Sequence, residues 1–153
     1  DWLLNLAETM QITDKTDINI ENFIKKNLYF IEWTQNIEII NNEFNFSIYT
    51  DELLFERVIK NLIENAIKYS LDKHLKIIIS SDKIIFENNI HTTLDKQKID
   101  QILTKFYSWS YNDSKWNGIW LSMIQEILKT LWYSLNIKSE NNKFIAEIIL
   151  KTP

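Results

Sequence analysis

Two asparagines and a lysine on one predicted helix have the types and spacing that could do chemistry. Asn61 and Asn65 are four residues apart, so in a helix their amides lie one turn above the other. Lys68 follows on the same side, with Tyr69 at its edge. Because asparagine costs about half a kcal/mol relative to alanine inside a helix, two aligned asparagines need a reason. Two amide oxygens and an ammonium group could hold a cation and phosphates; the alternative is a solvated face in an asparagine-rich chain.

The helix that positions these side chains is predicted to run from Asp51 to Ser70, with Thr50 or Asp51 as its N-cap. Its apolar residues recur at helical spacing and form one broad face. The residues of that face are Phe55, Val58, Ile59, Leu62, Ile63 and Ala66. The asparagines belong to a neighbouring polar stripe, which also contains Arg57 and Glu64.

The remaining patterns predict an α+β fold. Alternating or β-branched runs predict strands over residues 18–20, 37–40, 44–49, 75–80, 83–87, 133–139 and 143–150. Helical periodicity predicts helices over 21–31, 94–107 and 119–131, and residues 108–118 are expected to form a mobile loop. Strands 37–40 and 44–49 are expected to form a hairpin through Asn41 and Asn42. The resulting architecture is a two-layer sandwich, with one mixed, mostly antiparallel sheet and helices on one face.

Composition limits the function classes. A chain of 153 residues that is 45% hydrophobic supports one ordinary core. The net charge of −4 gives no reason to expect nucleic-acid binding. There is no cysteine, and the two histidines, His74 and His91, are too few for a histidine-built metal site. No apolar run reaches the length of a membrane span and no signal peptide is visible, so this part of the protein is expected to be cytoplasmic.

The segment NLIENAIKYS resembles the asparagine-bearing box of sensor histidine kinases, whose ATP-binding domain has the Bergerat fold. Its pattern N-x-x-x-N-A-x-K-Y is matched at every fixed position. The resemblance implies that Asn65 ligates Mg²⁺ with support from Asn61, that Lys68 reaches the phosphates, and that Tyr69 lies against the base. Hydrolysing relatives carry a glutamate at the position of Asn61. Because an amide cannot take a proton at neutral pH, Asn61 favours phosphoryl transfer over hydrolysis.

Two further boxes depart from the family pattern. Asn88 stands where the family has an aspartate that accepts a hydrogen bond from the adenine amino group, and its carbonyl can still accept one; a turn asparagine is the alternative. Trp116–Leu121 stands where the family has its second glycine box, G-x-G-x-G-L, whose backbone N–H groups hold the phosphates. The expected nucleotide contacts in this segment and just before it are Lys115, Trp116, Asn117, Gly118, Ile119, Trp120 and Leu121; for Lys115 a solvated loop lysine is the alternative.

Tryptophan stands at several positions where the family has glycine. The chain has 1 glycine and 6 tryptophans, whereas average usage would give about 11 glycines. Replacing Trp116 and Trp120 by glycine restores the box as GNGIGL, and Trp132 and Trp109 also fall where glycine is expected. We therefore hypothesise that UGA codons, which some genetic codes read as glycine, are printed here as tryptophan. If the tryptophans are genuine, two indoles fill the phosphate site.

The expected function is that of a histidine kinase catalytic domain, over residues 13–153, in a two-component system. It would bind Mg²⁺ and ATP, with Lys68 and Asn61 as catalytic residues, and phosphorylate a histidine on a dimerisation helix of the same protein. Residues 1–12 are expected to be the tail of that helix and a linker. A response regulator and a homodimeric full-length protein, with or without a membrane anchor, are the implied partners. The alternatives are a pseudokinase that serves as an interaction module, and an ATPase or anti-sigma kinase without a dimerisation domain.

Overall fold

The structure is a computed structural model, and it describes residues 14–29, 36–104 and 121–150. The elements, in chain order, are β1 (Lys15–Asn19), α2 (Ile20–Leu28), β2 (Ile37–Asn41), β3 (Ser47–Asp51), α3 (Glu52–Tyr69), β4 (Leu75–Ile79), β5 (Lys83–Asn89), α4 (Lys96–Ile102), α5 (Leu121–Thr130), β6 (Ser134–Glu140) and β7 (Lys143–Ile149). The predicted α+β class is confirmed. The predicted helical tail and linker at 1–12 and the loop at 108–118 lie outside the described residues. The helices predicted over 21–31 and 94–107 are shorter than expected, because α2 ends at Leu28 and α4 ends at Ile102.

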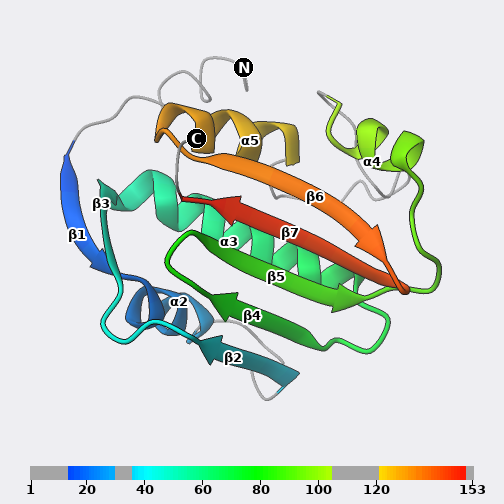
Figure 1. The fold of residues 1–153 in the computed structure, drawn as a ribbon, viewed down its shortest axis with the longest axis horizontal. Helices are drawn as coiled ribbons and strands as arrows, with labels where there is room; N and C mark the ends of the chain where they lie inside the picture. Colours follow the sequence, from blue (N-terminus) through cyan, green and yellow to red (C-terminus); the bar gives the residue numbers. More distant parts are fainter. Residues whose placement is uncertain (1–13, 30–35, 105–120, 151–153) are drawn as a thin grey trace.

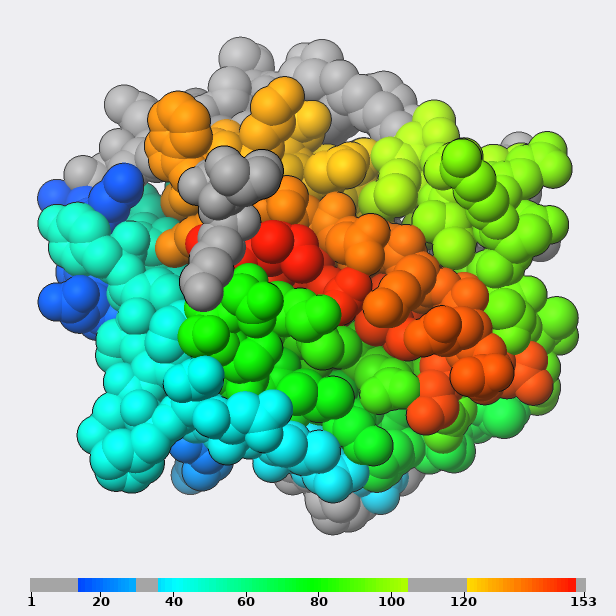
Figure 2. Space-filling model, viewed as in Figure 1, coloured from blue at the N-terminus to red at the C-terminus, as the bar shows by residue number. Residues whose placement is uncertain are grey.

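A five-stranded sheet in the order β2-β4-β5-β7-β6 forms one layer. β2 runs parallel to β4, and the other neighbouring pairs are antiparallel. Figure 1 shows α3 running behind this sheet, and the opposite face of the sheet turned toward the viewer. In the space-filling view from the same side, the strands from β4 to β7 form much of the visible surface (Figure 2). The helices therefore cover one face of the sheet, as predicted.

The core lies between the sheet and the helices, because the strands alternate buried and partly exposed residues. In β5 the residues that face the helices are Ile84, Phe86 and Asn88, and in β4 they are Leu75, Ile77 and Ile79. The apolar face of α3 packs on this layer, and all six of its predicted residues are buried. Asn88 is thus a polar residue at a position that the fold otherwise fills with hydrocarbon.

The predicted hairpin of residues 37–40 and 44–49 is wrong. β2 pairs with β4, whereas β3 pairs with β1 in a separate two-stranded sheet. The turn itself is real, because the Asn41 side chain accepts a hydrogen bond from the Glu43 backbone N–H at 2.9 Å. Its Nδ2 also donates to Glu21 at 2.9 Å, which ties the end of β2 to α2. The local turn signal was correct, but it does not specify which strands become partners.

The central helix and the four later strands agree with the predictions. Asp51 caps α3, since its side chain accepts a hydrogen bond from the Leu54 backbone N–H at 3.0 Å. β4 and β5 form a hairpin, as do β6 and β7, whose turn residues Asn141 and Asn142 both have positive φ. No helix among the described residues is long and apolar enough to cross a membrane.

Candidate functional site

The polar stripe of α3 divides into a half-buried part and an exposed part. Asn61, Asn65, Lys68 and Tyr69 are half-buried, whereas Arg57 and Glu64 are exposed. The asparagines therefore do not lie on a fully solvated face, which was the alternative for this stripe. Glu64 lies between the two asparagines in the sequence but projects into solvent, so the predicted stripe is narrower than the sequence indicated.

The carboxamide of Asn61 is oriented by its own helix. Its Nδ2 donates a hydrogen bond to the Arg57 backbone carbonyl at 2.7 Å. With the nitrogen engaged in this way, Oδ1 is the atom that a cation would use. Within the described ranges, no group of three or more His, Cys, Asp or Glu side chains forms a metal site. A magnesium ion here would use amide oxygens, and it commonly completes its octahedron with phosphate oxygens and water.

The C-terminal end of α3 is held by a lysine that the sequence did not single out. Lys73 has a φ of 58° and its Nζ donates to the Ile67 and Lys68 carbonyls at 3.2 and 3.3 Å. These contacts satisfy carbonyls that a helix end leaves without partners. A different cation, Lys68, has its Nζ 5.4 Å from the centre of the Tyr69 ring.

Two hydrogen bonds attach this end of α3 to the end of β5. The Leu71 backbone N–H donates to the Asn89 carbonyl at 2.8 Å, and Asn89 Nδ2 donates to Asp72 Oδ2 at 2.9 Å. The bond from Asn89 is the main reason that the pKa of Asp72 lies below its ordinary value. Sequence reasoning missed Asp72 and Asn89. They place the last turn of α3 beside the strand end that carries Asn88.

Asn88 is buried and its carbonyl has no partner among the described residues. Only 3% of the residue is exposed, and no hydrogen-bond donor reaches Oδ1. Its Nδ2 makes one contact, to the Asn89 carbonyl at 3.5 Å, which is at the outer limit for a hydrogen bond. An unsatisfied buried amide costs about 1–3 kcal/mol, so a site built to receive a ligand explains it better than a turn does. The alternative of a turn asparagine does not hold, because Asn88 lies within β5.

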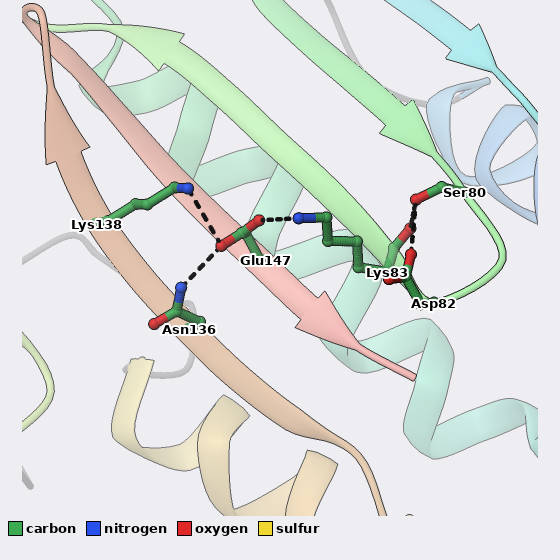
Figure 3. Close-up of polar contacts among 6 residues, drawn as sticks. All are labelled: Ser80, Asp82, Lys83, Asn136, Lys138 and Glu147. Atoms are coloured by element: carbon green, nitrogen blue, oxygen red, sulfur yellow. Dashed lines mark hydrogen bonds and ion pairs between the residues drawn. The ribbon is translucent and has the colours of Figure 1, made fainter. Parts of the chain in front are cut away.

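The opposite face of the sheet holds a polar cluster of a different kind. Glu147 of β7 is 4% exposed and points away from the face that carries Asn88. Its carboxylate accepts a hydrogen bond from Asn136 at 2.8 Å and contacts Lys83 at 3.1 Å and Lys138 at 3.7 Å. Figure 3 shows these three partners around the carboxylate. We call this set of four residues the Glu147 cluster.

The second glycine box is represented by its last residue alone. Lys115, Trp116, Asn117, Gly118, Ile119 and Trp120 lie outside the described residues. Leu121 begins α5, and its side chain is buried in the core. If Leu121 contacts a phosphate, it would therefore do so through its backbone N–H. α5 packs against α3, so Leu121 belongs to the same helical layer as the asparagines.

Trp132 occupies a position that is typical of glycine. The Tyr133 N–H donates to the Leu128 carbonyl at 2.8 Å and the Trp132 N–H to the Lys129 carbonyl at 3.0 Å. This pair of bonds is a Schellman motif, in which the residue after the helix is left-handed and usually glycine. Trp132 has a φ of 68° and is 73% exposed. Three of the other four described non-glycine residues with positive φ are asparagines, which tolerate this conformation.

Comparisons with known proteins agree with the fold. The family described as "Histidine kinase-, DNA gyrase B-, and HSP90-like ATPase" matches residues 50–152. A comparison with curated proteins gives no match. Among solved structures, the nucleotide-free catalytic domain of the histidine kinase ThkA is similar with a TM-score of 0.72 and 18% identity, covering 90% of this chain and 96% of that chain. Mycobacterial sensor histidine kinase MprB gives 0.69 and 13%, covering 88% and 95%.

A further similar structure is the histidine kinase AdeS of Acinetobacter baumannii, with a TM-score of 0.66 and 19% identity, covering 96% of this chain and 75% of that chain. At these identities the likeness concerns the fold. It agrees with the fold that the resemblance of the asparagine box implied.

Proposed function

Because the chain belongs to the family of histidine kinase-, DNA gyrase B- and HSP90-like ATPases, we propose that it is the catalytic domain of a sensor histidine kinase. It binds ATP with Mg²⁺ and transfers the γ-phosphoryl group to a histidine on a dimerisation helix. The observation that carries the proposal is the buried carbonyl of Asn88, which has no hydrogen-bond partner in the described part of the chain. It lies one residue from the point where the end of α3 is bonded to β5. An adenine amino group would supply the missing donor.

The residues of this chain act by binding and orientation. The carboxamides of Asn61 and Asn65 provide oxygen donors for the metal, and the Lys68 ammonium reaches the phosphates. Bound Mg²⁺ supplies neutralisation of charge on the phosphate oxygens. In the transfer, the bond between the γ-phosphorus and the β–γ bridging oxygen breaks, a nitrogen–phosphorus bond forms on the acceptor histidine, and ADP leaves. Neither Asn61 nor Asn65 can act as a base, which favours this transfer over attack by water.

The test is calorimetric titration of the domain with a non-hydrolysable ATP analogue, with and without Mg²⁺. We expect binding that requires Mg²⁺ and falls by about 10–100-fold in Asn65→Ala. Glu64→Ala is the matched control, because Glu64 is the neighbouring residue and is exposed; it should bind normally. Absence of binding in the unchanged protein would reject the proposal in favour of an interaction module.

A second measurement separates kinase from ATPase. The domain is mixed with a dimerisation segment that carries an acceptor histidine and with ATP labelled at the γ-phosphate. The kinase proposal expects acid-labile label on that segment. Release of inorganic phosphate without labelling would instead support an ATPase.

The proposed activity also depends on the identity of residues 116 and 120. We propose that UGA is read as glycine in the organism that makes this protein, and Trp132 supports this. An exposed tryptophan at a left-handed helix stop is unfavourable by about 1–2 kcal/mol, whereas glycine fits without penalty. The same reading would give glycine at 116 and 120, which leaves room for phosphates. The pseudokinase alternative requires tryptophan at both positions.

The codons at 116, 120 and 132 decide this point. UGA at all three, with glycine found by peptide mass spectrometry of protein from the native host, is the expected result; UGG would end the hypothesis. Independently, Trp132→Gly should raise the free energy of unfolding by about 1 kcal/mol over Trp132→Ala, because alanine keeps the Cβ that the left-handed conformation opposes.

A further inference from the structure

Asn88 carries both a hydrogen-bond donor and an acceptor at the place where an aspartate carries acceptors alone. We propose that this amide lets the nucleotide site accept purines with an oxygen at C6 as well as those with an amino group. The inference rests on the proposed function, because it concerns the base of the same nucleotide.

The first support is that both ends of the amide are available to a ligand. Oδ1 of Asn88 has no donor among the described residues, and Nδ2 has a single contact at 3.5 Å. A rotation of 180° about the last side-chain bond exchanges Oδ1 and Nδ2. It costs almost no hydrogen-bond energy, because no short hydrogen bond fixes either orientation. By contrast, Asn27 is a buried asparagine whose Nδ2 is fixed by a bond of 2.9 Å to the Phe23 carbonyl.

The second support is the surroundings of Asn88. It alternates with Ile84 and Phe86 on the face of β5 that the helices cover, and it is 3% exposed. In such a setting an unpaired polar group on the base is rejected strongly, so the hydrogen-bond pattern of residue 88 decides which base is accepted. The bond between Leu71 and Asn89 keeps this position beside the end of α3.

The chemistry of the two purine classes follows from their edges. Adenine offers a donor at the 6-amino group and an acceptor at N1, whereas hypoxanthine offers an acceptor at O6 and a donor at N1. A carboxylate accepts hydrogen bonds only, so it pairs with the amino group and repels O6. A carboxamide pairs with the adenine edge in one orientation and with the hypoxanthine edge in the other. Asn88 therefore relaxes a selection that an aspartate would enforce.

The experiment compares ADP and IDP, which differ only in this part of the base, by calorimetric titration in the presence of Mg²⁺. The protein is the domain with the residues that its own host places at 116 and 120. We expect the two dissociation constants to agree within about tenfold for the unchanged protein. Asn88→Asp should weaken IDP relative to ADP by at least about tenfold.

Asn141→Asp is the matched control, because it makes the same change of charge in the exposed turn between β6 and β7. It should leave the ratio of the two dissociation constants unchanged. If Asn88→Asp does not fold, the ratio for the unchanged protein still decides. A preference for ADP above about 100-fold in the unchanged protein would overturn the inference and leave the proposed function intact. Failure of both nucleotides to bind would overturn both.

Discussion

The two faces of the five-stranded sheet each bury one polar side chain, and the two side chains differ in whether they have hydrogen-bond partners. On the open face, the Glu147 carboxylate has three partners within 3.7 Å. On the face covered by helices, the Asn88 carbonyl has no partner among the described residues. A satisfied buried group contributes to stability, whereas an unsatisfied one reduces it until a ligand arrives. The difference separates a structural polar cluster from a candidate binding site.

The largest expected effect on stability comes from a change to Glu147, on the face of the sheet that no helix covers. Glu147→Ala removes the carboxylate that Asn136 and Lys83 share, and we expect the free energy of unfolding to fall by about 2 kcal/mol. Chemical denaturation of the nucleotide-free domain measures this. Nucleotide affinity should not change, because Glu147 faces away from Asn88.

The matched control for this change is Glu140→Ala, at the exposed end of β6. It should leave the free energy of unfolding nearly unchanged. An equal loss in both variants would mean that the Glu147 cluster has no special role.

The next prediction is a variant at Asn88 that should raise the free energy of unfolding. Asn88→Leu replaces the amide by a hydrocarbon group of nearly the same shape, so it removes the unsatisfied carbonyl and keeps the packing. We expect the nucleotide-free domain to gain about 1 kcal/mol while nucleotide binding is lost. The same change at Asn27 should not stabilise the domain, because that amide already donates to Phe23. Destabilisation by Asn88→Leu would show that Asn88 is structural.

The smallest effect is the pH dependence of stability. Burial pushes the pKa of Glu147 upward, but the hydrogen bonds from Asn136 and Lys83, with the charges of two lysines, outweigh it and hold the pKa below the ordinary glutamate value. A group whose pKa is lowered by folding stabilises the folded state above its unfolded pKa, about 4.3, and loses that contribution as the pH falls further. Glu147→Gln should therefore reduce the decline in stability below about pH 5. An unchanged acid profile would contradict this.

Sequence reasoning identified the elements better than it identified their partners. The periodicity of α3 and the cap at Asp51 follow from local chemistry, and both are confirmed. The pairing of β2 with β4 could not be predicted from neighbouring residues, because the two strands are more than thirty residues apart in the sequence. Asn41 indicates a turn, but its side chain bonds to Glu21 of α2 and does not identify the partner strand.

The residues of the candidate site were predicted from sequence motifs, and the structure adds how deeply each of them is buried. Asn61, Asn65 and Asn88 were expected from the resemblance, and their surroundings were not. The bond between Asp72 and Asn89 joins residues 17 positions apart, so only the folded chain reveals it. Glu147 is the one charged residue in the interior of β7, and its three partners come from the two neighbouring strands. The roles predicted for residues 115–120 stay predictions.

The position of β7 has a consequence for how the chain folds as it is made. β7 is the last of the described strands in chain order, yet it lies between β5 and β6 in the sheet. During synthesis, β5 can pair with β4 at once, but its other edge has no partner until β7 has been made. β7 follows β5 by more than fifty residues, so the five-stranded sheet forms only after residue 149 has left the ribosome. An unpaired strand edge is a place where partly folded chains aggregate, so the pairing of β5 with β7 closes that edge only late in synthesis.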